Sequence, residues 1–123
     1  MPVRSFNSSV FVWPRKQQVE EALRRWAQLE SHKHSSLLKL GYFGSYARGD
    51  WGVGSDLDLV VVIEDSTEPF LRRALSWDLS TLPVPADLIV YTLSEWNELA
   101  LQSSRFFHTL CRKTVWISPV EPS

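Results

Sequence analysis

The segment that most constrains the fold is 44–63, in which a glycine-rich stretch leads directly into an apolar run. Two aspartates, Asp56 and Asp58, open that run, and four consecutive β-branched residues close it. Such a run predicts a strand buried on both faces, in a central position of a sheet. Glycine also lets a backbone approach a ligand closely. Four of the chain's five glycines fall within eleven positions, at Gly44, Gly49, Gly52 and Gly54.

The rest of the chain predicts helices and two further core strands. Apolar residues recur at helical spacing over 15–31 and 68–82. Short apolar runs at 37–43 and 86–92 have the length and composition of strands. We also expect a short helix from Tyr46, helices beginning near residues 94 and 103, an extended segment at 8–13 and an edge strand at 114–117.

This order of elements predicts a single α/β (α+β) domain over residues 1–123, with its core at about 15–117. Helices would cover a small mixed β-sheet. Ser94 is the expected start of a helix, with Asn97 or Glu98 completing a capping pair. Thr67 or Ser66 is the expected cap of the helix at 68–82.

Composition limits the classes of function. The chain has 123 residues and a net charge of −1, so it has no basic face for direct nucleic-acid binding. Cys111 is the only cysteine, no apolar run is long enough to span a membrane, and the first residues do not resemble a signal peptide. We therefore expect a soluble cytoplasmic protein. The six tryptophans could be core residues or part of a partner surface.

Three aspartates are the candidate metal ligands. Asp56 and Asp58 would lie on one face of their strand, about 7 Å apart at the usual rise per residue. If the strand at 86–92 pairs with that strand, Asp87 would reach the same edge. Clustered carboxylates suit one or two Mg²⁺ ions, which keep waters and bind substrate phosphates.

Gly44 and Ser45 are the candidate phosphate-binding residues. The backbone at Gly44 and the hydroxyl of Ser45 could contact phosphate oxygens. Arg48 either reaches a triphosphate or pairs with Asp50 at the surface, and we favour the phosphate. Each feature alone is common in turns and strand ends, but the combined pattern favours a nucleotide site.

These residues resemble the minimal nucleotidyltransferases of the DNA polymerase β superfamily. The matching segments are 44–49, 54–59 and 87–90, and the resemblance extends over about residues 15–117. It implies that Asp56, Asp58 and Asp87 are the catalytic, Mg²⁺-binding carboxylates. It also implies that Gly44 and Ser45 bind the nucleotide, and we add Arg48 and Ser55 to that group. ATP would be the donor and pyrophosphate the leaving group.

Such minimal proteins are similar to the antitoxins of toxin–antitoxin pairs. The resemblance implies a hetero-oligomer with an all-helical HEPN-type ribonuclease toxin, encoded nearby, whose tyrosine receives AMP. Only 36 residues follow Asp87, and this favours an acceptor on another chain. Two alternatives remain: neutralisation by binding alone with a vestigial site, or nucleotidyl transfer to a small molecule of the aminoglycoside type by a dimer.

Other residues could suggest different functions. Arg25 and His32 have the spacing of a ribonuclease motif, but Trp26 and the mixed pattern of elements argue against one. We interpret the pair as a surface arginine and a loop histidine. The segment 72–73 is expected on a solvated helix face, and Trp51 in an exposed loop that could contact a base or a partner.

Overall fold

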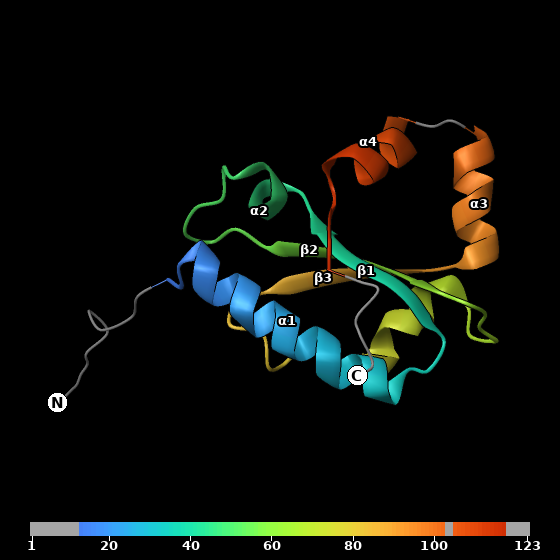
Figure 1. Cartoon of the computed structure of the whole chain (residues 1–123), viewed down its shortest axis with the longest axis horizontal. Coiled ribbons are helices and arrows are strands. Elements are labelled where there is room, and N and C mark those ends of the chain that lie inside the picture. Colours follow the sequence, from blue (N-terminus) through green and yellow to red (C-terminus); the bar gives the residue numbers. More distant parts are fainter. Residues whose placement is uncertain (1–12, 103–104, 118–123) are drawn as a thin grey trace, which may run out of the picture.

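The computed structural model describes residues 13–102 and 105–117, which form a mixed sheet with helices on both faces (Figure 1). The expected extended segment at 8–13 lies outside the described residues, apart from Trp13. The α/β prediction is confirmed. The elements in order are α1 (Lys16–Lys33), β1 (Leu37–Phe43), α2 (Ser45–Arg48), β2 (Leu57–Ile63), the 3₁₀ helix η2 (Phe70–Ser76), β3 (Ala86–Thr92), α3 (Leu93–Gln102), α4 (Arg105–Lys113) and β4 (Val115–Trp116).

The four strands of the sheet have the order β3-β2-β1-β4. β2 is antiparallel to β1 and parallel to β3, so the buried strand predicted from its β-branched run is central, as expected. Every residue of β2 except Asp58 is buried. The start of β2 is aligned with the end of β1 and the start of β3, because Asp58 pairs with both Phe43 and Asp87.

Alternation along β2 divides the core into two layers. Leu57, Leu59, Val61 and Ile63 belong to the cluster that includes the buried face of α1, whereas Val60 and Val62 pack with Trp96 and Leu110 of α3 and α4. The side chain of Asp58 has the same parity as Val60. The carboxylates at this edge therefore belong to the α3 and α4 layer.

The expected buried stripe of α1 is partly wrong. Val19, Leu23 and Trp26 are buried as predicted, but Leu29 is 57% exposed and Glu30 is buried in its place. The Glu30 carboxylate lies 3.2 Å from Lys33 Nζ, and this partner offsets part of the cost of burying its charge.

The helix predicted at 68–82 is wrong. The chain forms only η2, and Ser66 accepts a hydrogen bond from Glu68 N in a local turn instead of capping a helix. Arg72 is exposed, as predicted for the segment 72–73, but Arg73 is buried and the apolar Leu71 is exposed.

Arg73 is held between three elements. Its guanidinium donates to both carboxylate oxygens of Glu95, at 2.5 and 3.0 Å, and to the carbonyls of Glu68 and Val90. Glu95 also accepts from Thr92 N while Thr92 Oγ1 accepts from Glu95 N. The capping box of α3 is therefore Thr92 with Glu95, and not the expected pair beginning at Ser94.

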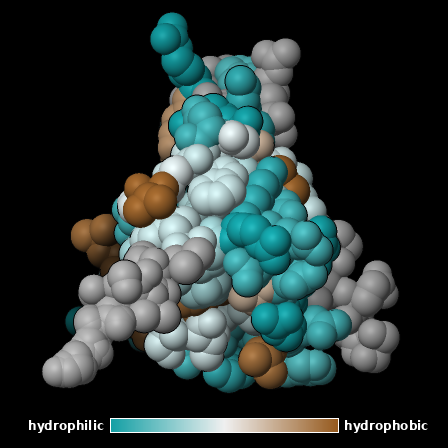
Figure 2. All heavy atoms as spheres, turned by 90° about the vertical axis from the view of Figure 1, so that its left-hand side faces the viewer, coloured by the Kyte–Doolittle hydropathy of each residue, from teal (hydrophilic) through white to brown (hydrophobic). Residues whose placement is uncertain are grey.

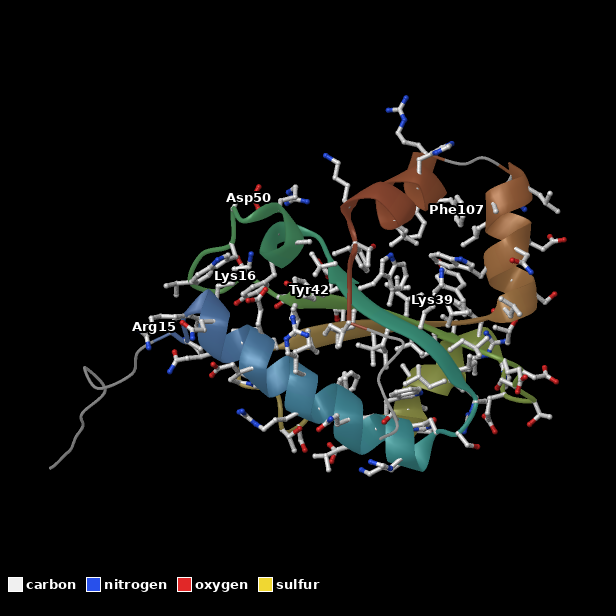
Figure 3. The ribbon with its side chains drawn as sticks, in the orientation of Figure 1. Arg15, Lys16, Lys39, Tyr42, Asp50 and Phe107 are labelled. Atoms are coloured by element: carbon white, nitrogen blue, oxygen red, sulfur yellow. The ribbon has the colours of Figure 1, made fainter. Side chains whose placement is uncertain are left out.

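None of the six tryptophans, all of which lie in described parts of the chain, is exposed. Trp96 packs against Phe107 and Trp116, and the Lys39 ammonium lies 5.2 Å from the ring centre of Trp116. Figure 3 shows Lys39 and Phe107 in this layer, with Tyr42 toward α1. Three of the tryptophans are buried in the core and three are partly buried against it, so the fully exposed apolar side chains are of other types.

Candidate active site

Gly44 connects the end of β1 to the short helix α2 in a conformation that favours glycine. Its φ is +76°, and Arg48 N donates to its carbonyl in the first turn of the helix. A Cβ placed on Gly44 would lie 2.2 Å from Asp58 Oδ2. The glycine-rich turn is therefore packed directly against the carboxylate that the sequence singled out.

Two of the three aspartates are neighbours at the edge where β2 and β3 begin, and the third lies just before that edge. Asp58 and Asp87 are directly opposite each other in register, and Asp56 immediately precedes β2. Burial raises the pKa of the Asp58 carboxyl, and the negative charges of Asp87 and then Asp56 raise it further. The positive charge of Arg48 acts in the opposite direction.

This arrangement provides hard oxygen donors at a point of accumulated negative charge, which fits Mg²⁺. The missing side chain at Gly44 also leaves Asp58 Oδ2 room on that side. Within the described residues, no three His, Cys, Asp or Glu side chains are already arranged around one common metal position.

The other expected nucleotide-binding residues occupy the turn and the loop that follows it. Ser45 is the first residue of α2, and its carbonyl accepts from Gly49 N and Asp50 N. Arg48 Nε lies 3.1 Å from Asp50 Oδ2, and both side chains are more than half exposed. Ser55 Oγ accepts from Gly52 N, which closes a turn before Asp56. Of the two roles considered for Arg48, the structure shows the surface ion pair with Asp50. The Ser55 hydroxyl makes a hydrogen bond within its own loop.

Trp51 is not the exposed loop residue that we expected. Its ring is stacked on Tyr46, with centroids 5.5 Å apart and planes 7° apart, and it packs against the α1 core cluster. Tyr46 is fully buried, and Trp13 Nε1 donates to its hydroxyl at 3.1 Å. The sequence offers one indication of this packing: Trp51 is a large apolar residue between Asp50 and Gly52, and such a residue in a polar loop can anchor the loop to the core.

The end of the molecule that presents α2 and the start of α1 has a largely polar surface. Figure 2 views this end and shows hydrophilic residues over much of it, with isolated hydrophobic side chains between them. Asp50 lies on the loop above α2 in Figure 3.

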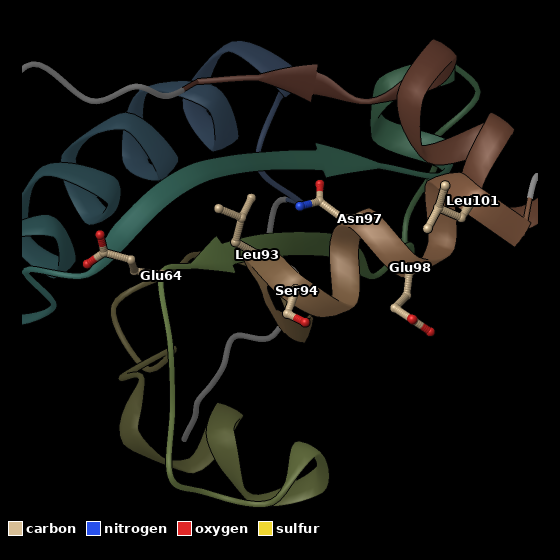
Figure 4. A pocket seen from close by; sticks show the side chains of 6 residues that line it. All are labelled: Glu64, Leu93, Ser94, Asn97, Glu98 and Leu101. Atoms are coloured by element: carbon tan, nitrogen blue, oxygen red, sulfur yellow. The ribbon is translucent and has the colours of Figure 1, made fainter.

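A surface pocket of about 480 Å³ lies at the other end of the sheet (Figure 4). Its lining comes from Glu64, just beyond β2, and from residues of α3 such as Leu93, Asn97 and Leu101. The strand β2 separates this pocket from the carboxylates at its start.

Among the described residues no helix is both long and apolar enough to cross a membrane.

A family comparison agrees with the geometry. The family model for the nucleotidyltransferase domain matches residues 15–110, which is most of the chain. The chain belongs to the nucleotidyltransferase domain family. The resemblance noted in the sequence is thereby confirmed at the level of the family, and no curated protein matches.

The chain is similar to several solved structures at low sequence identity. A protein of Sulfolobus solfataricus described as a nucleotidyltransferase is 18% identical with a TM-score of 0.60, and the match covers 82% of this chain and 80% of that one. A toxin–antitoxin solved with AMP-PNP is 21% identical with a TM-score of 0.49, covering 84% and 72%. A mutant of the toxin–antitoxin MntA-HpeT is 20% identical with a TM-score of 0.48, covering 85% and 72%.

Proposed function

We propose that this nucleotidyltransferase domain moves AMP from Mg·ATP to a hydroxyl of a partner protein and thereby neutralises it. The partner would be an all-helical HEPN-type ribonuclease toxin and the acceptor a tyrosine. The observation that supports transfer most directly is the register of Asp58 with Asp87, beside the turn at Gly44. Two carboxylates and the Gly44 turn therefore lie at one edge of the sheet.

In this reaction the acceptor oxygen attacks the α-phosphorus of ATP, the bond from that phosphorus to the bridging oxygen breaks, and pyrophosphate leaves. Asp56, Asp58 and Asp87 would hold Mg²⁺, which supplies positive charge for the reacting phosphate. Asp87 begins the edge strand β3, whereas Gly44 lies beyond the other side of β2. The acceptor hydroxyl would therefore enter on the β3 side and give its proton to the Asp87 carboxylate.

An exposed apolar segment supports a protein as the acceptor. Phe70, Leu71 and Leu75 of η2 are 42%, 86% and 76% exposed, although they are large and close together in the chain. Phe70 also contacts Tyr91 on the edge strand β3, with centroids 5.5 Å apart. Large exposed apolar groups on one segment are typical of surfaces that contact other proteins.

The direct test combines the purified chain with the purified product of the adjacent gene, ATP and Mg²⁺. Intact-protein mass spectrometry should show the partner gaining the mass of one AMP, and peptide mapping should locate it on a tyrosine. Asp58→Ala should abolish the gain while the far-UV circular dichroism spectrum is unchanged. An unmodified partner, with a known adenylyltransferase active in the same buffer, would reject the proposal.

Neutralisation by binding alone is the second candidate, and the exposed residues of η2 favour it equally. The two functions separate in cells that express the toxin. If Asp58→Ala rescues growth as well as the unmodified chain, binding is sufficient. If rescue is lost while the complex still co-purifies, transfer is required. Modification of an aminoglycoside and not of the protein would indicate the small-molecule alternative.

A further inference from the structure

The loop 49–56 leads from the turn at Gly44 to Asp58 and contains Asp56, yet few of its contacts reach the rest of the fold. Its hydrogen bonds are local: Gly49 and Asp50 donate to Ser45, and Gly52 and Ser55 bond to each other. A loop with three glycines has much conformational freedom to lose when it orders. Local bonds of this kind do not set where the loop lies relative to the sheet.

Trp51 supplies that longer-range contact. Of the two large apolar side chains in the loop, Val53 is 80% exposed, whereas Trp51 is stacked on Tyr46 and packed on the α1 cluster. Tyr46 follows Ser45 directly and is itself fixed by the bond from Trp13. The stack thus links the loop to the phosphate-binding helix and to the start of α1.

The anchor and the carboxylates lie in opposite layers. Trp51 and Tyr46 pack in the α1 layer, while Asp58 has the parity of the α3 and α4 layer. The loop therefore passes across the end of the sheet, fixed on one side, and delivers Asp56 on the other. Because the stack of Trp51 on Tyr46 fixes the first part of the loop, it restricts the positions of Ser45 and Asp56 relative to each other.

We propose that Trp51, through its stack on Tyr46, is a positioning residue that holds the loop 49–56 in the conformation that binds the metal–triphosphate. It does not touch the nucleotide. This inference rests on the proposed function, because it assumes that Mg·ATP is the ligand. Trp51→Ala should leave the fold intact, free the loop, and weaken Mg·ATP binding.

The experiment uses the full chain and two readouts. Isothermal titration measures the Kd of Mg·ATP. Limited trypsin digestion follows cleavage after Arg48, whose exposed side chain lies at the end of α2, directly before the loop. Trp51→Ala should raise the Kd by roughly ten- to a hundredfold, the scale expected when binding groups lose their positions. It should also speed cleavage after Arg48. Trp51→Phe, which can stack on Tyr46, should restore both values to near those of the unmodified chain.

A matched control removes packing from the far end of the sheet. Leu37 is half-buried against the same cluster but pairs with Ile63, at the opposite end of β2 from Asp58. Leu37→Ala should change neither the Kd nor cleavage after Arg48. The inference is overturned if Trp51→Ala binds Mg·ATP within twofold of the unmodified chain, or if Leu37→Ala weakens binding equally. If the unmodified chain does not bind Mg·ATP, the proposed function falls, and this inference falls with it.

Discussion

Asp58 and Asp87 occupy directly opposite positions on the parallel strands β2 and β3. Neighbouring strands are about 4.8 Å apart, so two ionised carboxylates at this position repel each other. Burial already raises the pKa of Asp58, and Asp87 raises it further. Such a pair costs stability and gives a reason to expect a cation here, since a divalent ion removes the repulsion.

Replacing Asp58 by Asn should stabilise the metal-free protein slightly. The substitution removes one charge from an opposed like-charge pair, which is worth about 0.2–1 kcal/mol of unfolding free energy at neutral pH. It should also abolish the stabilisation by Mg²⁺ and ATP, which for the unmodified chain reaches about 2.7 kcal/mol at a hundredfold excess over Kd. Urea denaturation with and without Mg·ATP measures both. Asp65→Asn, beyond the other end of β2, is the control that should keep the ligand effect.

The pH dependence of the metal-free protein should carry the signature of Asp58. Because its folded pKa is raised, the carboxyl contributes stability that is fully present below its unfolded pKa. This contribution is lost as the pH rises through the pKa of Asp58 in the folded protein, because the folded protein then releases a proton that it binds more tightly than the unfolded chain does. Urea midpoints across this acidic window should fall more steeply with pH in the unmodified chain than in Asp58→Asn. Parallel curves would contradict the assignment.

Substituting one partner of the ion pair between Arg73 and Glu95 should cost more unfolding free energy than substituting the other. Glu95→Gln leaves Arg73 buried without its main partner and weakens the cap of α3, so we expect a loss of about 2–3 kcal/mol. Arg73→Met leaves Glu95 partly exposed, where water can replace the guanidinium, and should cost about 1 kcal/mol. Denaturant melts of both variants and of the double variant measure the difference. Equal losses in the two single variants would contradict the predicted asymmetry.

The same pair predicts a pH effect of the opposite sign to that of Asp58. The hydrogen bond from Arg73 lowers the pKa of Glu95, and the bond from Thr92 N adds to it. This contribution is present above the unfolded pKa of the carboxyl and is lost as the pH falls through the folded value. In Glu95→Gln the loss of stability in acid should therefore be smaller than in the unmodified chain. A midpoint that falls equally in both proteins would exclude this contribution.

The sequence predicts those segments of the fold whose structure depends on their own residues. It does not predict segments whose structure depends on contacts with residues far away in the chain. The bounds of β1 and β3 agree with the apolar runs, although only some residues of each strand are buried. The helix prediction for 68–82 is wrong because the helical spacing of its apolar residues does not correspond to a buried helix face. The conformation of this segment depends on Arg73 reaching Glu95, 22 residues away, and no local pattern reveals that bond.

The candidate site was predictable in composition but not in arrangement. Gly44, Asp56, Asp58 and Asp87 follow from residue types at strand ends, yet that β3 lies beside β2 and in parallel register is a property of the whole sheet. The stacking of Trp51 on Tyr46 was missed for a related reason. A loop tryptophan is equally compatible with solvent, a ligand or the core until the neighbouring layer is known.

Substituting Gly44 by Ala tests whether the turn and the metal ligand are in direct contact. The backbone at Gly44, with φ +76° and ψ −149°, should cost alanine about 1–3 kcal/mol, and the new Cβ would also meet Asp58 Oδ2. Gly49→Ala is the comparison, because its φ is +88° but nothing lies within 4 Å of a Cβ there. It should cost only about 1–2 kcal/mol of backbone strain.

A double-mutant cycle separates strain from contact. If the Cβ displaces Asp58, Gly44→Ala should cost at least about 0.5 kcal/mol less in an Asp58→Ala background, while Gly49→Ala should cost the same in both. Mg·ATP binding should fall in Gly44→Ala and persist in Gly49→Ala, as measured by titration calorimetry. Additive losses at Gly44 would mean that the glycine is needed for its backbone conformation alone. The close approach to Asp58 would then have no energetic consequence.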